Sequence, residues 1–434
     1  METLAGRRRV TVEISLAGRV SQSLFRNVLN SVFFCGRCAI LRLFRLLFRF
    51  FVVFLLGKEC VMAVERLNIQ PELLRWVIQR AGVSEEKAIE SFPLLSSWLA
   101  LEKLPTLSQL KTFAEKFYVP LGYLFMNNLP IENIPFPMFR GEAGQQEHFD
   151  LNVYDTVMNI QARQEWLEEY LEENEIETCD FVGSVDARSS SISEVVSRLR
   201  TILNLDSRWA FSLATPDAAV SLLGQRLEDA GVFLAYNGVV GNNTHRPLKV
   251  SECRGFALVN EKAPYIFINS ADSKSAQLFT LIHEVAHLML GVSAGHAGSE
   301  VLYHEATEQY CDRVAAEFLV PASVLRDIWE NDTKAASRRF KVSELVVARR
   351  AHDIDLMSNE DYRAFWLMYS QRRIQVKKNS SGGSFYLTSV KRVGRNFAIH
   401  VRNAVNDKQL SYTEAYRLTG LYGKTYDNFM TNNI

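Results

Sequence analysis

Cysteine is scarce in this sequence, with six residues among 434. Small secreted proteins that depend on disulfides are dense in cysteine, so this class is excluded and reduced thiols are expected. Cys35 and Cys38 have the spacing of a metal-binding pair, but no second pair or nearby histidine completes such a site. We interpret this spacing as coincidental and expect a cytoplasmic protein.

Long apolar runs are missing as well. The most membrane-like stretch, Ile40 to Leu56, is interrupted by three arginines, and its longest apolar run is Phe50 to Leu56. A helix needs roughly 20 apolar residues to cross a bilayer, so we expect no stable membrane insertion. An amphipathic helix that lies on a membrane surface stays an open alternative.

The sequence also has no net charge, with 49 basic and 49 acidic residues, but the charges are unevenly distributed. Residues 1–61 contain ten Lys or Arg and three acids, which leaves 39 bases and 46 acids from Met62 onward. Lys58-Glu59 can be encoded by a ribosome-binding sequence at a plausible distance before Met62. We therefore hypothesise that 1–61 is a basic and hydrophobic extension and that Met62 is the natural start.

The rest of the chain predicts an α+β fold that is mostly α-helical, because helical apolar spacing dominates and strand-like segments are few. Breaks in composition suggest five segments. They are a helix-turn-helix-like domain (62–130), a helical linker region (131–215), a core with a small β-sheet (216–330), a helical region (331–375) and a basic C-terminal helical module (376–434).

The segment 62–130 resembles the phage-repressor-type (XRE-type) helix-turn-helix domain, most clearly from Leu95 to Phe125. DNA binding by such a domain needs cations that face phosphates, and Arg, Lys, Asn or Gln at the recognition helix. Here seven Lys or Arg are balanced by seven Glu, and residues 91–95 are Ser-Phe-Pro-Leu-Leu. This pattern favours a fold kept for packing or protein contact over DNA binding, which stays the alternative.

A predicted helix over 273–290 carries the clearest chemistry. Its His283-Glu284-x-x-His287 pattern places two histidines just over one turn apart, so both imidazoles can bind one zinc ion. Glu284 lies beside the metal position, where it is expected to be the general base that takes a proton from a water molecule held by the metal. The alternative, a surface helix with two histidines, is disfavoured because the helix is apolar.

Catalytic zinc takes three protein ligands and keeps a fourth position for water. A second amphipathic helix, over 308–321, places Glu308 and Asp312 on one face. We expect Glu308 to be the third ligand and Asp312 to accept the free N–H of a ligand histidine. Competing third ligands are His296, Glu300, His304 and Glu305, whereas Cys311 is expected to be a packed thiol.

These two helices resemble the ImmA/IrrE family of bacterial metallopeptidases. The likeness rests on His283-Glu284-x-x-His287, the segment from Glu308 to Pro321 and the strand Arg254-Gly255-Phe256-Ala257, and it extends from about Met62 to Ile434. The Glu308-x-x-x-Asp312 spacing is also similar to that of thermolysin-like zincins, so the resemblance implies a zincin-like metallopeptidase core over 216–330. The family implies proteolysis of a regulatory protein, often a repressor, in stress response or mobile-element control.

A hairpin is predicted just before the motif helix, from strands at 255–260 and 265–269. The second strand, Tyr265 to Asn269, is expected to offer an open edge to an extended substrate, unless a neighbouring strand covers it. Tyr303 and His304 are the residues we name as candidates for stabilising an oxyanion.

The stretch 371–402 contains eight Lys or Arg and no acid. Within it, Lys391, Arg392 and Arg395 are candidate contacts to nucleic acid, and a solvated basic face is the equally weighted alternative. An acidic protein partner would suit the same charges.

Together these features predict a zinc-dependent endopeptidase that cleaves a specific regulatory protein. The alternative is a transcriptional regulator or antitoxin of a toxin–antitoxin pair, in which the peptidase fold is a scaffold that binds the cognate toxin. The presence of Glu284 beside two histidines favours the enzyme, because a scaffold has no need of a general base.

Overall fold

The structure is a computed structural model that describes residues 65–132, 150–177, 179–292, 301–372 and 384–434, without the side chains of 301–305. The extension over 1–61, the Cys35 and Cys38 pair and the expected start at Met62 lie outside these residues. The described residues form an α+β fold that is mostly α-helical, as the sequence predicts. None of their helices is long and apolar enough to cross a membrane.

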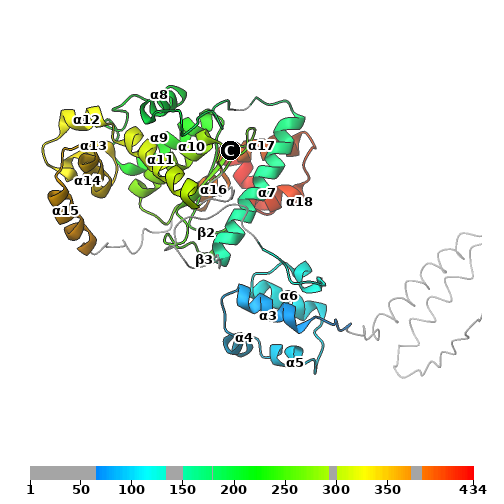
Figure 1. The fold of residues 1–434 in the computed structure, drawn as a ribbon. Coiled ribbons are helices and arrows are strands. Elements are labelled where there is room, and N and C mark those ends of the chain that lie inside the picture. The colour runs from blue at the N-terminus through cyan, green and yellow to red at the C-terminus, as the bar shows by residue number, and fades with distance from the viewer. Residues whose placement is uncertain (1–64, 133–149, 178, 293–300, 373–383) are drawn as a thin grey trace, which may run out of the picture.

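The first described elements are short helices that pack into an N-terminal bundle, blue and cyan in Figure 1. They are α3 (Pro71–Arg80), α4 (Glu85–Ser91), α5 (Leu95–Leu99), α6 (Leu107–Lys116) and η1 (Leu121–Phe125). A capping box between Thr106 and Gln109 starts α6. Trp98 and Phe113 meet in the bundle's core with ring centroids 5.9 Å apart. Consecutive short helices are what the sequence predicts here, while DNA binding by them stays a prediction.

A three-stranded sheet forms the centre of the larger body. Its strand order is β1 (Phe233–Asn237), β5 (Tyr265–Asn269) and β4 (Gly255–Leu258). β4 and β5 form the predicted antiparallel hairpin, and β1 runs parallel to β5. A separate two-stranded sheet pairs β2 (Val239–Val240) with β3 (Asn243–Pro247).

The expectation that Tyr265–Asn269 presents an open edge is wrong. β5 is the central strand, bonded to β1 on one side and to β4 on the other, and all five of its residues are buried. The parallel β1–β5 pairing joins segments about 30 residues apart through a crossover. No local sequence pattern predicts such a pairing. Within the described ranges, the side of β4 that faces away from β5 has no strand partner.

Helices cover both faces of this sheet, and each face has its own apolar core (Figure 1). One face packs against α8 (Ile192–Leu203), α9 (Pro216–Asp229), α10 (Lys274–Leu290) and α11 (Val301–Leu319). The other packs against α7 (Leu151–Glu173), α17 (Arg395–Asn406), α18 (Tyr412–Thr419) and α19 (Lys424–Asn432). Side chains alternate along the strands, so Leu234 and Ile266 enter the first core while Phe233 and Tyr265 enter the second.

Two further groups of helices complete the body. α12 (Ala322–Ile328), α13 (Thr333–Phe340), α14 (Glu344–Asp353) and α15 (Asn359–Gln371) follow α11, and α16 (Phe385–Val393) precedes α17. Gly394 joins α16 to α17 with φ +89°, and a Cβ atom at this position would collide with the carbonyl oxygen of Leu234 in β1. The close approach of the α16–α17 turn to β1 therefore requires a glycine at this position.

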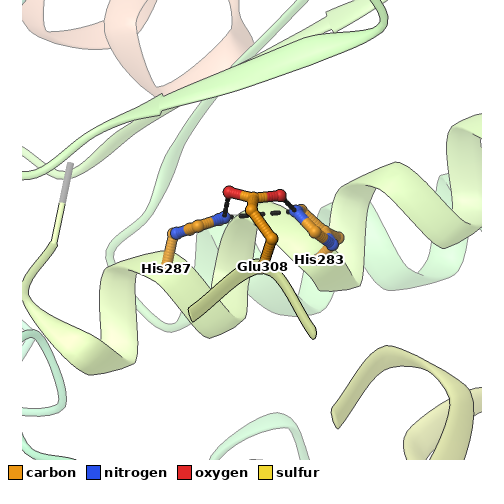
Figure 2. A group of neighbouring side chains, drawn as sticks. All are labelled: His283, His287 and Glu308. Atoms are coloured by element: carbon orange, nitrogen blue, oxygen red, sulfur yellow. Dashed lines mark hydrogen bonds and ion pairs between the residues drawn. The ribbon is translucent and has the colours of Figure 1, made fainter. Parts of the chain in front are cut away.

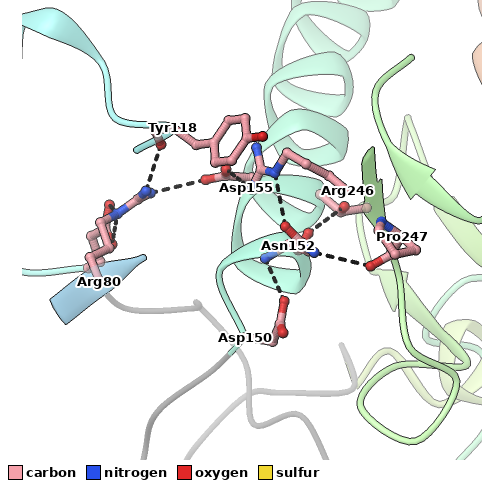
Figure 3. Close-up of polar contacts among 9 residues, drawn as sticks. Arg80, Tyr118, Asp150, Asn152, Asp155, Arg246 and Pro247 are labelled. Atoms are coloured by element: carbon pink, nitrogen blue, oxygen red, sulfur yellow. Dashed lines mark hydrogen bonds and ion pairs between the residues drawn. The ribbon is translucent and has the colours of Figure 1, made fainter. Parts of the chain in front are cut away.

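A polar network connects the N-terminal bundle to the body (Figure 3). Asp155 on α7 accepts from Arg80 of α3 at 3.0 Å and from Arg246 of β3 at 2.6 Å. Arg80 also donates to the carbonyl of Tyr118 at 2.8 Å and pairs with Glu132. Both arginine side chains are at most 9% exposed, so their desolvated charges need compensation, which Arg246 receives from Asp155 and Arg80 from Asp155 and Glu132.

Gly255 at the start of β4 is expected to tolerate no side chain. A Cβ atom there would lie 2.7 Å from Thr280 Cγ2 of α10 and 2.8 Å from the carbonyl oxygen of Phe267. We expect Gly255→Ala to lower the free energy of unfolding by about 1–3 kcal/mol through overpacking, measured by urea denaturation. Gly122→Ala is the control, because its Cβ meets nothing within 4 Å, and an equal loss in both variants would contradict the assignment.

Candidate metal centre

The helix α10 buries the motif residues on the face that packs toward α11. Its ends follow local signals, since Ser273 caps the N-terminus and Gly291 ends the helix in a left-handed conformation. His283, Glu284 and His287 are 5%, 6% and 2% exposed. Polar side chains buried this deeply need partners, and α11 supplies them.

Figure 2 shows how Glu308 of α11 reaches across to both histidines. Its Oε2 lies 3.1 Å from His283 Nε2 and its Oε1 lies 3.1 Å from His287 Nε2. The two Nε2 atoms are also 3.1 Å apart. On the far side of the first ring, His283 Nδ1 lies 3.0 Å from Asp312 Oδ1. The structure thus brings together the four residues that the sequence predicts for ligand and support roles.

This arrangement fits a divalent metal ion. The ligand atoms of His283, His287 and Glu308 all lie within 4.8 Å of one another, so one ion can touch all three. When Asp312 accepts the Nδ1 proton of His283, the Nε2 lone pair of that ring is left directed at His287 and Glu308. Two imidazole nitrogens facing each other across 3.1 Å need a cation or a proton between them.

The charges of the site are strongly coupled. Burial lowers the pKa of His283, but hydrogen bonds to Asp312 and Glu308 outweigh burial and raise this pKa to about 10. Burial raises the pKa of Glu308, but hydrogen bonds from His283 and His287 and their charge hold it far below its usual range. In the protein without metal, His283 is therefore a cation at neutral pH and Glu308 is a carboxylate.

The charge of Glu284 acts on two buried thiols near the metal-ligand group. Burial and then the charge of Glu284 raise the pKa of Cys253, which precedes β4, to about 12. Burial also raises the pKa of Cys311 on α11, followed by the charges of Glu308 and Glu284. Cys311 is fully buried in the apolar core, where it is the packed thiol that the sequence predicts. Both thiols stay protonated at neutral pH and are poor metal ligands in that form.

Other predicted residues lie elsewhere. His296 and Glu300 fall outside the described residues, and α11 includes Tyr303, His304 and Glu305 without described side chains. The basic candidates lie on α16 and α17, away from the metal-ligand group and close to polar residues of the body. Lys391 Nζ is 4.0 Å from Asp217, Arg392 donates to Asn242 at 3.2 Å, and Arg395 lies beside Glu228.

Comparison with known proteins agrees with this site. Residues 239–352 match the model of the IrrE N-terminal-like domain, the family Peptidase_M78. The resemblance to the ImmA/IrrE family is therefore confirmed for this segment, which contains both α10 and α11. Residues 393–432 match a domain of unknown function. No curated protein and no solved structure matches the chain.

The match supports a peptidase-like function at the level of the family, and the geometry adds residues that the motif alone does not reveal. Gly255 and Thr280 set the approach of β4 to α10, so they determine how close the strand lies to Glu284. In the sequence, Gly255 stands out only as part of the Arg254–Ala257 strand segment, and Thr280 does not stand out. The need for glycine there becomes visible only once α10 is placed against the sheet.

Removing Glu308 is expected to abolish tight metal binding. Glu308→Ala deletes one of three ligands and should lower the affinity for Zn²⁺ by more than about 100-fold, whereas Asp312→Asn should cost about 10–100-fold by loosening the His283 ring. Competition against a chelator dye measures both. Glu330→Gln, an exposed carboxylate on the loop after α12, is the control. Wild-type affinity in Glu308→Ala would contradict its role.

Metal affinity is also expected to rise with pH. The pKa of His283 is about 10 in the metal-free protein, so the bound form must release this proton below that pH. The affinity for Zn²⁺ should then increase about tenfold per pH unit between pH 6 and 8. Isothermal titration in two buffers of different ionisation enthalpy counts the released protons, and a count of zero would contradict the charge assignment.

Proposed function

We propose that this protein is a zinc-dependent endopeptidase that cleaves a specific regulatory protein. The observation that carries the proposal is the convergence of His283, His287 and Glu308 on one point, with Glu284 next to them on α10. Two imidazoles and one carboxylate are the ligand set of the zinc peptidases that keep a fourth position open for water. The match to the Peptidase_M78 family supports the same reaction class.

Zinc is the metal that this donor set suits best. Imidazole nitrogens favour zinc over magnesium or calcium, which prefer sites built entirely from oxygen. The residues whose ligand atoms lie close enough to share one ion are His283, His287 and Glu308, and no thiol belongs to this group among the described residues. When bound, zinc would polarise the attacking water and the scissile carbonyl.

Glu284 and Asp312 would have separate roles in the reaction. Glu284 would accept the proton of the attacking water and pass it to the leaving amine, because it lies one residue beyond a ligand and is only 6% exposed. Asp312 would hold His283 in the tautomer that leaves Nε2 free for the metal. The burial of His283, Glu284 and His287 strengthens the electrostatic interactions that these side chains make.

We expect the substrate to bind beside β4. This strand packs on α10 through Gly255 and Thr280, close to Glu284. An extended segment that lies along β4 would bring its carbonyl near the metal ligands. A segment that must be extended suits a flexible linker or loop in a regulatory protein such as a repressor, in stress response or mobile-element control.

Glu284→Gln tests the proposal against the scaffold alternative. The variant should bind about one Zn²⁺ and keep the wild-type melting temperature, because glutamine fills the same space, yet it should lose cleavage by about 10²–10⁴-fold. Repressor-like and toxin-like proteins encoded beside this gene serve as candidate substrates, and mass spectrometry detects their fragments. Glu330→Gln is the matched control.

The same variant decides between the two functions in cells. An enzyme loses its biological effect in Glu284→Gln, while a scaffold that neutralises a cognate toxin keeps it. A full effect in cells, together with intact zinc content and no fragments, would overturn the proposal and favour the antitoxin.

A further inference from the structure

A second cavity lies where the N-terminal bundle meets the body. This junction cavity has a volume of about 640 Å³ and is lined by α6 and η1 of the bundle, by α7, by Arg246 of β3 and by α18. The volume lies within the range of small-molecule sites. Because α10 and α11 contribute no lining residue, the junction cavity is separate from the metal-ligand group.

The charge of the junction cavity is positive. Its lining contains Lys111, Arg163, Arg246 and Arg417 together with two acids, Glu115 and Asp155, which leaves an excess of two positive charges. Asp155 is already engaged by Arg246 and by Arg80 outside the cavity. Among the described residues, Lys111 and Arg417 have no ion-pair partner, although both are exposed. The cavity therefore has cationic groups available to an anion.

Arg163 is an independent sign of a binding site. It is only 6% exposed, and its Nη1 donates to the carbonyl of Arg392 at 3.0 Å. Its Nε is buried and has no hydrogen-bond partner in the described part of the chain. Buried arginine nitrogens are almost always paired, so a group that lines a cavity and still has a free donor points to a missing acceptor.

Tyr118 contacts both the bundle and the body at this junction. It follows α6 in the left-handed conformation, with φ +53°, at a position that normally favours glycine. Its carbonyl accepts from Arg80, and the guanidinium of Arg246 lies 4.3 Å from its ring centroid (Figure 3). A glycine there would lose the ring contact, so the side chain serves the junction rather than the helix end.

We propose that the junction cavity binds a phosphate-bearing small molecule of about nucleotide size. The two excess positive charges match a phosphate dianion. The guanidinium of Arg417 suits its oxygens, and Arg163 offers its unpartnered Nε, because its Nη1 already donates to main-chain carbonyls. Leu121, Met158 and Leu418 provide apolar surface for the organic part. Residues of α6, η1, α7, β3 and α18 meet around one volume of about 640 Å³, which fits a small molecule better than an extended acidic peptide. A bound ligand would hold the bundle against the body.

Isothermal titration of the full chain with adenosine 5′-monophosphate tests the proposal. Adenosine is the probe without phosphate, and a tetraglutamate peptide is the acidic-peptide probe. We expect the nucleotide to bind, and Arg417→Ala and Lys111→Ala to weaken it by about tenfold each, as the loss of a charged hydrogen bond does. Arg349→Ala on α14 removes an equally exposed cation elsewhere and should change nothing.

Hydrogen exchange then locates the ligand. Protection should increase at 111–121, 155–163 and 417–418 on addition of the nucleotide. Three results would overturn the proposal: no binding of the nucleotide, equal binding of adenosine, or affinity that survives in Arg417→Ala and Lys111→Ala. Binding of the peptide alone would also overturn it and would assign the junction cavity to a protein partner. Because no readout depends on cleavage, failure here leaves the peptidase proposal untouched.

Discussion

The pairing of α10 with α11 through buried charge is the interaction on which the rest of the site depends. His283 and His287 lie against an apolar core, where a lone imidazolium or carboxylate would cost several kcal/mol. Glu308 and Asp312 compensate both rings from one helix face, so the two helices can approach only in the register that joins these four side chains. The same register brings three ligand atoms together, which links the folding of the core to the formation of the metal-ligand group.

The sheet determines what else can reach this group. β5 is buried along its whole length because helices pack on both faces and strands lie on both sides. At β1, the turn around Gly394 approaches so closely that a side chain would collide with Leu234. β4 has β5 as its only strand neighbour among the described strands, and Gly255 allows it to lie near Thr280 of α10. β4 and the metal-ligand group are therefore neighbours for packing reasons alone.

Much of this arrangement could be predicted from the sequence, because it depends on local signals. Ser273 and Gly291 mark the ends of α10, and the hairpin before it follows from two apolar runs around a short turn. Glu308 and Asp312 were identifiable because four residues return a helix to the same face. The parallel pairing of β1 with β5 was not predictable, since a crossover separates the strands and burial on both faces removes the alternation that reveals an edge.

The junction between bundle and body is held by charged groups, whereas the two cores beside the sheet are held by apolar packing. Arg80 and Arg246 share one carboxylate, Asp155, and no buried apolar cluster of the described residues spans the bundle and the body. Buried apolar area stabilises a contact in proportion to its size. A buried ion pair, in contrast, stops stabilising the contact when one partner moves away. The position of the bundle relative to the body therefore depends more on charge pairing at this junction than on apolar burial. An anion bound beside Arg246 would place a second negative charge near Asp155, so the proposed ligand would act directly on this contact.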